Sequence, residues 1–186
     1  MVSNMPPSLY SRIAGLRLPF LYAMALLTVV AAKGPLAWQW GALILFGALV
    51  RIWAAGHICK NELLAASGPY AYVRHPLYLG SFLSALGIFF MIGRPALTVL
   101  FAAGFALFYG CKIWCEEVFL SSKFGAGYSS YRQRVPAFFP NPFKIWGKTP
   151  YAFSIRKAIQ NGEIKSLACT AAQTALVFLA AGLRQP

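Results

Sequence analysis

Long apolar runs, separated by short polar breaks, organise this chain. Each run is close to the roughly 20 residues that an α-helix needs to cross the hydrocarbon core of a bilayer. Short tripeptides rich in glycine and proline end several of the runs and would terminate the helices there. The pattern predicts an all-α integral membrane protein with about five transmembrane helices. The predicted spans are 16–32, 36–55, 76–92, 96–115 and 166–183.

The polar segments divide what we interpret as a single membrane domain. Residues 1–15 are expected to be a tail or an interfacial segment. Only Lys33-Gly34-Pro35 separates the first two spans, so 16–55 is expected to form a tight antiparallel helical hairpin. Residues 56–140 carry the polar motifs and are expected to be the functional core. Residues 141–186 are expected to hold a loop, a basic surface helix and the final span.

The segment after the fourth span predicts a short polar helical region. The fourth span is expected to stop at Glu116-Glu117, where two carboxylates interrupt the apolar run. Two short helices should follow, separated by a turn at Gly125–Gly127, and the second should end at Pro136. Within 141–186, the basic helix is expected over 151–165.

Composition supports a membrane protein and argues against a nucleic-acid partner. The chain is 59% hydrophobic and only 11% charged, whereas globular proteins carry about 25% charged residues. The net charge of +13 comes from basic residues in the breaks between apolar runs, not along one soluble face. With a cytoplasmic N-terminus, every basic residue except Lys33, Arg94 and Arg184 falls on the cytoplasmic side, which is the usual bias of membrane proteins. The four cysteines lack zinc or CxxC spacing, so neither a metal nor a disulfide is expected.

The stretch from Gly68 to Gly80, GPYAYVRHPLYLG, concentrates polar chemistry between two apolar runs. His75 precedes a proline and is pushed toward extended geometry, so the next helix should begin at Pro76 with His75 as its cap. Free N–H groups at that helix N-terminus favour an anionic group. Arg74 and His75 would strengthen such a site.

Arg74 and His75 are expected to lie beside Glu116 and Glu117. The third and fourth spans are antiparallel about the break at 93–95, and the two pairs are nearly equidistant from it. Together the pairs could match a zwitterion, the cations facing a carboxylate and the acids an ammonium. S-adenosylmethionine carries both groups. The alternative is that the two acids only form ion pairs at a helix end, with Lys112, Lys123 or Arg132.

Two stretches carry a family resemblance that covers about 50–140. GPYAYVRHPLYLG, followed by EEVFLSSKFGAGYSSYRQRVPAFFP, resembles the isoprenylcysteine carboxyl methyltransferase and phospholipid methyltransferase group of integral-membrane enzymes. RIWAAGHICKN, from Arg51 to Asn61, resembles bacterial members of that group. The resemblance implies methyl transfer from S-adenosylmethionine to a lipid or a lipidated acceptor. The distribution of basic residues, and not the resemblance, predicts that this site lies at the cytoplasmic face of the membrane.

The resemblance and the chemistry of methyl transfer together indicate which residues would form the site. Arg74 could orient an anionic acceptor, and Glu117 is a candidate base, as are His57 and His75; Arg51 is a second candidate for the orienting role. Tyr70 could stack on adenine, although anchoring at the membrane interface explains it as well. Gly80 could make room for the cofactor, or it could allow close helix packing. The residues expected to bind the cofactor are Tyr70, His75, Tyr78, Gly80, Glu116, Glu117, Tyr128, Tyr131 and Arg132.

Two other readings stay open. Double-bond reductases of sterol metabolism share an RHPxYxG-like stretch in a related membrane fold and use NADPH. A membrane scaffold without enzymatic activity would need the polar residues only for structure. The adjacent acids followed by FGAGYSSY favour the methyltransferase.

Overall fold

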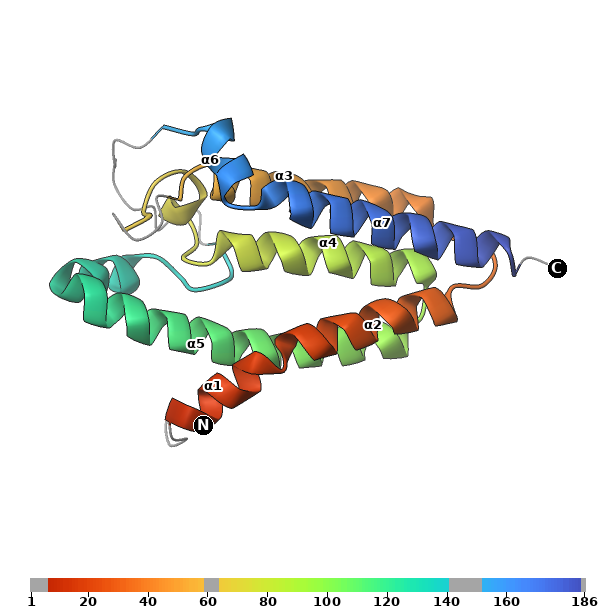
Figure 1. The fold of residues 1–186 in the computed structure, drawn as a ribbon, viewed down its shortest axis with the longest axis horizontal. Helices are drawn as coiled ribbons and strands as arrows, with labels where there is room; N and C mark the ends of the chain where they lie inside the picture. Colours follow the sequence, from red (N-terminus) through yellow and green to blue (C-terminus); the bar gives the residue numbers. More distant parts are fainter. Residues whose placement is uncertain (1–6, 59–63, 141–151, 185–186) are drawn as a thin grey trace.

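The structure, a computed structural model, describes residues 7–58, 64–140 and 152–184, and these residues form helices and connecting segments without a strand. Figure 1 shows the helices lying side by side in an elongated bundle. In chain order the elements are α1 (Pro7–Gly15), α2 (Arg17–Ala31), η1 (Trp38–Trp40), α3 (Gly41–Ala55), η2 (Gly68–Ala71), α4 (Pro76–Ile92), α5 (Pro95–Arg134), α6 (Ile155–Gln160) and α7 (Glu163–Gly182).

The apolar helices have the dimensions of membrane spans. Four helical segments of the described chain are long and apolar enough to cross a bilayer: Ser8–Ala31, Trp38–Ala55, Pro95–Arg134 and Glu163–Gly182. The helix α4 is also apolar but slightly shorter, with 17 residues. The prediction of an all-α integral membrane protein is therefore confirmed.

The closest pairing in the bundle joins α3 and α4, and glycines make it possible. A Cβ atom on Gly47 would lie 2.5 Å from the carbonyl oxygen of Gly80, and one on Gly87 would lie 3.0 Å from the backbone nitrogen of Ile44. The Ser84 hydroxyl donates to the carbonyl of Ile44, at 3.0 Å. Small residues allow membrane helices to approach this closely and to gain dispersion contacts and short hydrogen bonds.

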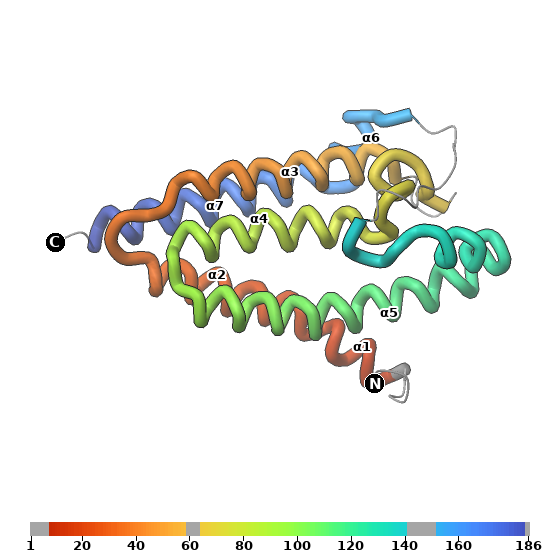
Figure 2. The backbone as a smooth tube through the Cα atoms, turned by 180° about the vertical axis from the view of Figure 1, so that it is seen from behind, coloured from red at the N-terminus to blue at the C-terminus, as the bar shows by residue number. Residues whose placement is uncertain are grey.

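The prediction that the two helices of 16–55 pack on each other as a tight hairpin is wrong. The helices α2 and α3 run in opposite directions, but α3 packs along α4, and α2 packs on α7, α5 and α4. Figure 2 shows the connection between α2 and α3 as a wide loop, not a tight turn. The small-residue face of α3 matches α4, whereas α2 contributes Met24 to an aromatic cluster with Phe89 and Phe105.

From residue 7 onward the N-terminal segment is helical, so of the two expectations for it, a tail or an interfacial segment, the tail is wrong. The helix α1 packs on α5, and the ring of Tyr10 stacks on Trp114 with centroids 4.0 Å apart. Tyr10 is only 1% exposed. From residue 7 onward, this segment is therefore part of the helical core and not a free tail.

The helix α5 is longer than predicted. It runs through Glu116-Glu117 without a break, and its one non-helical residue is Gly125, at φ 50° and ψ −123°. Forty residues of helix span about 60 Å, twice the roughly 30 Å hydrocarbon core. The apolar part up to Cys115 thus suffices to cross the bilayer, and the remainder projects beyond it. The predicted turn near Gly125 and the helix end before Pro136 are both confirmed.

The C-terminal part closes the bundle with a short helix and a span. The basic helix expected over 151–165 is reduced to α6, because Gly162, at φ 86°, ends it and α7 begins at Glu163. The final span predicted for 166–183 is confirmed as α7. The loop expected after residue 140 lies outside the described residues.

One ion pair fastens α7 to the α3–α4 pair. Arg51 donates from Nε to Oε1 of Glu163 at 2.7 Å and from Nη2 to Oε2 at 3.2 Å. Its Nη1 donates to the hydroxyl of Ser81 and to the carbonyl of Leu77. Every nitrogen of this guanidinium is engaged, so the structure does not leave Arg51 available to orient an anionic acceptor.

Candidate functional site

Backbone geometry fixes the loop that leads into α4. Gly68 has φ +58°, and a Cβ atom there would lie 2.5 Å from Nε2 of the His57 ring, so this position requires glycine. His57 is buried, and its Nδ1 lies 2.9 Å from the carbonyl oxygen of Trp53. These contacts give His57 a supporting position beneath the loop.

The backbones of Arg74 and His75 form hydrogen bonds with the segment that follows α5. The backbone N–H of Arg74 donates to the carbonyl of Pro136 at 2.8 Å, and that of His75 donates to Ala137 at 3.1 Å. The Arg74 side chain continues this clamp, with Nη1 donating to the carbonyls of Arg132 at 2.7 Å and Val135 at 2.9 Å. The end of α5 is thus held against the start of α4.

The carboxylate of Glu117 pairs with the basic side chains around it. Its Oε1 lies 2.7 Å from Nη2 of Arg74 and 3.3 Å from Nε2 of His75, and its Oε2 lies 3.4 Å from Nε of Arg132. Burial alone would raise the pKa of Glu117, but the hydrogen bond from His75 and the charge of Arg74 outweigh it and lower the pKa below its usual value. Glu117 is therefore an ionised carboxylate inside a closed ion-pair network.

Glu116 has a different environment from its neighbour. The Tyr78 hydroxyl donates to its Oε2 at 2.8 Å, and Nδ1 of His75 lies 4.0 Å from the same oxygen. The ring of His75 stacks on Tyr78. The Glu116 side chain is 37% exposed, against 9% for Glu117. Glu116 thus presents a carboxylate that Tyr78 orients and that no arginine or lysine neutralises through an ion pair among the described residues.

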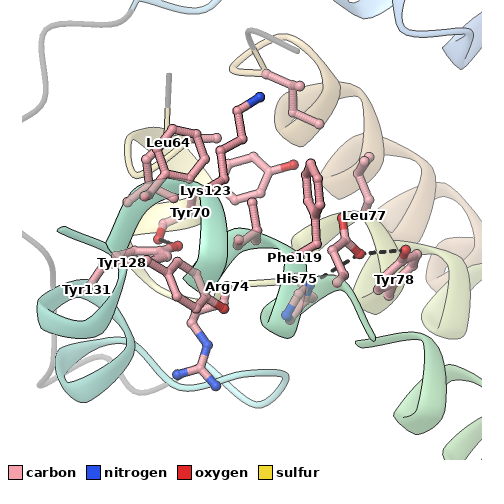
Figure 3. A pocket seen from close by; sticks show the side chains of 15 residues that line it. Leu64, Tyr70, Arg74, His75, Leu77, Tyr78, Phe119, Lys123, Tyr128 and Tyr131 are labelled. Atoms are coloured by element: carbon pink, nitrogen blue, oxygen red, sulfur yellow. Dashed lines mark hydrogen bonds and ion pairs between the residues drawn. The ribbon is translucent and has the colours of Figure 1, made fainter. Parts of the chain in front are cut away.

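Glu116 faces a pocket of about 240 Å³ at the site end of the bundle. This volume is slightly below the range of about 300–1,000 Å³ that is usual for small-molecule sites. Figure 3 shows side chains converging on it from η2, the start of α4 and the projecting part of α5. The lining residues are Ile58, Leu64, Ala65, Tyr70, Arg74, His75, Leu77, Tyr78, Glu116, Phe119, Leu120, Lys123, Phe124, Tyr128 and Tyr131.

A buried tyrosine in this pocket has an unsatisfied hydroxyl. Tyr128 is 1% exposed, and its hydroxyl has no hydrogen-bond partner among the described residues. Burial raises the pKa of Tyr128 to about 12, so it is a neutral donor at physiological pH. An unpaired buried hydroxyl is costly and calls for an explanation. A ligand with a hydrogen-bonding group in this pocket would supply one.

Two further tyrosines complete the wall. The Tyr131 hydroxyl donates to the backbone carbonyl of Tyr70 at 2.7 Å, which ties the end of α5 to η2. Burial raises the pKa of Tyr70 well above its usual value. Tyr70 and Tyr131 therefore present neutral aromatic surface to the pocket.

The predicted meeting of the two charge pairs is confirmed, since Arg74 and His75 both contact Glu117. The arrangement is nevertheless different from the one expected. Arg74 pairs with Glu117, and its guanidinium points away from Lys123 and Leu64 in Figure 3. An anion site at the start of α4 is therefore not supported by Arg74.

Three of the nine expected cofactor contacts, Gly80, Glu117 and Arg132, lie outside the pocket lining. Gly80 faces α3, where a Cβ atom would lie 2.6 Å from Cγ of Arg51 and from the Gly47 carbonyl oxygen; of the two readings considered for it, close helix packing is correct. Arg132 contacts Glu117 from the exposed side. Tyr70, His75, Tyr78, Glu116, Tyr128 and Tyr131 do line the pocket.

Sequence reasoning missed the aromatic and basic residues that follow Glu116. Phe119, Leu120 and Lys123 line the pocket, and their spacing of three, four and seven residues from Glu116 places them on one helix face. The signal was present in the sequence, but the expected helix end at Glu116-Glu117 concealed it. Glu163, the partner of Arg51, was also missed, because nothing local in the sequence links positions 112 residues apart.

Known proteins are similar to the part of the chain that builds this site. Residues 46–127 match the family described as phospholipid methyltransferase. A cobalt-zinc-cadmium resistance protein, CzcN, of Cupriavidus metallidurans is 37% identical over 113 residues, which cover 60% of this chain and 52% of the relative. No solved structure matches the chain at a significant level.

Several relatives carry the name protein-S-isoprenylcysteine O-methyltransferase. That of Schizosaccharomyces pombe is 43% identical over 81 residues, covering 44% of this chain and 34% of the relative. That of Homo sapiens is 33% identical over 110 residues, covering 53% of this chain and 39% of the relative. The chain thus spans between about a third and a half of the length of these relatives.

The matched segment contains α4, most of α3, and α5 as far as Gly127, and so includes His75, Tyr78 and both adjacent acids. The family resemblance noted in these motifs is confirmed. The pocket is built almost wholly by this segment, so the part of the chain that forms the candidate site is similar to the phospholipid methyltransferase family and to the isoprenylcysteine methyltransferases.

Proposed function

We propose that this protein is a methyltransferase that uses S-adenosylmethionine to methylate a lipid or a lipidated acceptor. The observation that carries the proposal is the Glu116 carboxylate, oriented by Tyr78 and facing a pocket that also contains the unpaired Tyr128 hydroxyl. The match of residues 46–127 to the phospholipid methyltransferase family supports the same reaction class.

The pocket residues fit the chemical groups of this methyl donor. Glu116 would attract a positive centre, either an ammonium or a sulfonium. Lys123 lies on the same lining and would attract a carboxylate. The rings of Tyr70, Phe119 and Phe124 provide surface on which an adenine could stack. Tyr128 would donate a hydrogen bond to a polar atom of the bound molecule.

Such a reaction requires the protein mainly to position the two reactants and to keep water away from them. S-adenosylmethionine, when bound, would supply a methyl group already activated by its sulfonium, which passes to the acceptor as the carbon–sulfur bond breaks. The protein must hold the two reactants in line and exclude water. The apolar lining residues Leu64, Leu77 and Leu120 serve the second task.

Arg74 and Glu117, which we expected to act on the substrate directly, are better suited to positioning. Both are engaged with each other and with the end of α5. We propose that they hold the helix carrying Glu116 and Tyr128 against the start of α4. His75, 5% exposed and between the two acids, would fix the orientation of both.

Binding measurements on the purified protein in detergent would separate this proposal from its main competitor. We expect saturable binding of S-adenosylmethionine by calorimetry and no comparable binding of NADPH. The pocket lining sets the Glu116 carboxylate against Lys123, with Arg74 already paired to Glu117, and this is too little positive charge for the several phosphates of NADPH. Binding of NADPH without binding of S-adenosylmethionine would replace the proposal with a reductase. Binding of neither would favour a scaffold.

A further inference from the structure

A second cavity lies inside the membrane part of the bundle, between α2, α4, α5 and α7. Its volume is about 500 Å³, within the usual range for small-molecule sites. Most of its surface is apolar, with Met24, Ile88, Phe89, Phe105 and Leu176 among its lining residues. Neither α2 nor α7 belongs to the matched family segment. Two of the four helices around the cavity therefore come from parts of the chain outside that segment.

The depth of the cavity matches one leaflet of a bilayer. On α7 its lining runs from Ser166 to Leu176, and on α4 from Ser81 to Phe89. Ten residues of helix measure about 15 Å, which is half of the roughly 30 Å hydrocarbon core. Both stretches begin near the end of the bundle that carries the site. The cavity therefore reaches from the site side to about the middle of the membrane.

The cavity opens sideways between α2 and α7. The two helices are joined toward the far end, where Gln173 donates to the Thr28 hydroxyl at 2.7 Å and Arg184 donates to the Val30 carbonyl at 2.8 Å. Toward the site end they diverge (Figure 1). On the two sides of this gap the lining residues are exposed, with Tyr22 at 72% on α2 and Ala172 on α7. A molecule within the leaflet can enter there.

A thin wall separates this cavity from the pocket that contains Glu116. Tyr78 lines the pocket and Tyr109 lines the cavity, and their rings are in edge contact with centroids 5.2 Å apart. Arg51, at the same end of the cavity, is neutralised by Glu163. The charge of Arg17 also acts on Tyr78 and Tyr109, so this end of the cavity is polar, in contrast to its apolar remainder.

We infer that the cavity binds one hydrocarbon chain of a membrane lipid, taken from the leaflet on the site side. The polar end of that lipid would then lie at the Tyr78–Tyr109 wall. Only the identification of this lipid as the methyl acceptor rests on the proposed function. The binding of the chain itself follows from the cavity's depth, its sideways opening and its apolar lining.

Photolabelling of the full chain in nanodiscs tests this inference. The discs would consist of phosphatidylcholine with a small fraction carrying a diazirine midway along one acyl chain. After illumination, mass spectrometry locates the label. We expect label on Met24, Phe89 and Phe105, which line the cavity and are at most 4% exposed, so that a probe reaches them only from inside. Label confined to outward-facing residues such as Phe178 and Leu179 would overturn the inference.

A pair of neighbouring variants provides the control. Ala172→Trp places a large ring at the opening and should lower the interior label severalfold. Ala171→Trp, on an exposed residue that does not line the cavity, should leave it unchanged. Equal effects of both variants would contradict the inference. Binding of S-adenosylmethionine is measured on the same samples. If the protein binds S-adenosylmethionine but the interior label is missing, only the inference about the cavity fails. If the interior label appears but S-adenosylmethionine does not bind, the hydrocarbon-binding cavity stands and the proposed function is wrong.

Discussion

Glu116 and Glu117 are identical and adjacent, yet the helix gives them opposite environments. Successive residues of an α-helix point about 100° apart. Glu117 therefore turns into the Arg74 clamp, while Glu116 turns toward Tyr78 and the pocket. The sequence predicted that the acids meet Arg74 and His75. It could not predict which acid takes the arginine, because that depends on the rotation of α5 about its axis.

The first prediction concerns Glu116. Replacing it with glutamine removes the charge but keeps the shape and the hydrogen bond from Tyr78. Affinity for S-adenosylmethionine should fall about tenfold, because a hydrogen bond or contact to a charged group contributes about 1.5–3 kcal/mol and 1.4 kcal/mol is a factor of ten. Calorimetry in detergent measures this change, and the midpoint of thermal unfolding should stay close to that of the wild type.

Glu117→Gln should show the reverse pattern, with its main effect on stability. Removing one member of a buried ion pair leaves Arg74 uncompensated, which typically costs about 3–5 kcal/mol. Since glutamine can still accept one hydrogen bond, we expect the lower part of this range. Thermal unfolding in detergent would report it as a lower midpoint. Equal behaviour of the two variants in both assays would contradict the division of roles.

At the scale of elements, hydropathy located the helices but not their partners. The apolar runs marked the spans within a few residues, since each run has the length of a bilayer crossing. The helix α3 nevertheless pairs with α4 and not with its neighbour α2, because the contact depends on Gly47 facing Gly80 and on Gly87 facing Ile44. This contact depends on how small residues on the faces of two helices fit together, and a hydropathy pattern along one segment carries no information about that fit.

The third prediction tests this contact. Gly47→Ala introduces a Cβ atom 2.5 Å from the carbonyl oxygen of Gly80, so the two backbones must move apart. Overpacking of this kind costs about 1–3 kcal/mol, and the midpoint of thermal unfolding should fall. Gly110→Ala is the matched control, because a Cβ atom there meets nothing within 4 Å. An unchanged midpoint for Gly47→Ala would show that the α3–α4 contact is less tight than described.

At the scale of the whole molecule, the ends of the bundle differ in chemistry. The helix α6 lies at one end with η2 and the projecting part of α5, both of which line the pocket, and the α4–α5 turn and the end of α7 lie at the other end (Figure 1). Most basic residues belong to segments at the site end, and Lys33, Arg94 and Arg184 belong to the opposite end. Positive charge favours the cytoplasmic side. We therefore propose that the site is cytoplasmic and that the N-terminus is on the same side.

The fourth prediction follows from this orientation. In a variant with the natural cysteines replaced, single cysteines would be introduced at the exposed positions Lys33 and Arg156. A maleimide that does not cross membranes should label Lys33→Cys in intact cells and Arg156→Cys only after permeabilisation. The opposite pattern would place the site on the outer face and would invert the proposed topology.

The central claim is that the pocket beside Glu116 binds the methyl donor. The most direct measurement is ultraviolet crosslinking of methyl-labelled S-adenosylmethionine to the purified protein, followed by peptide mapping. We predict saturable label, competed by unlabelled donor, in peptides that contain residues 70–78 or 116–131, and much less of it in Glu116→Gln. Saturable label confined to other parts of the chain, or label that excess donor does not compete, would contradict the claim.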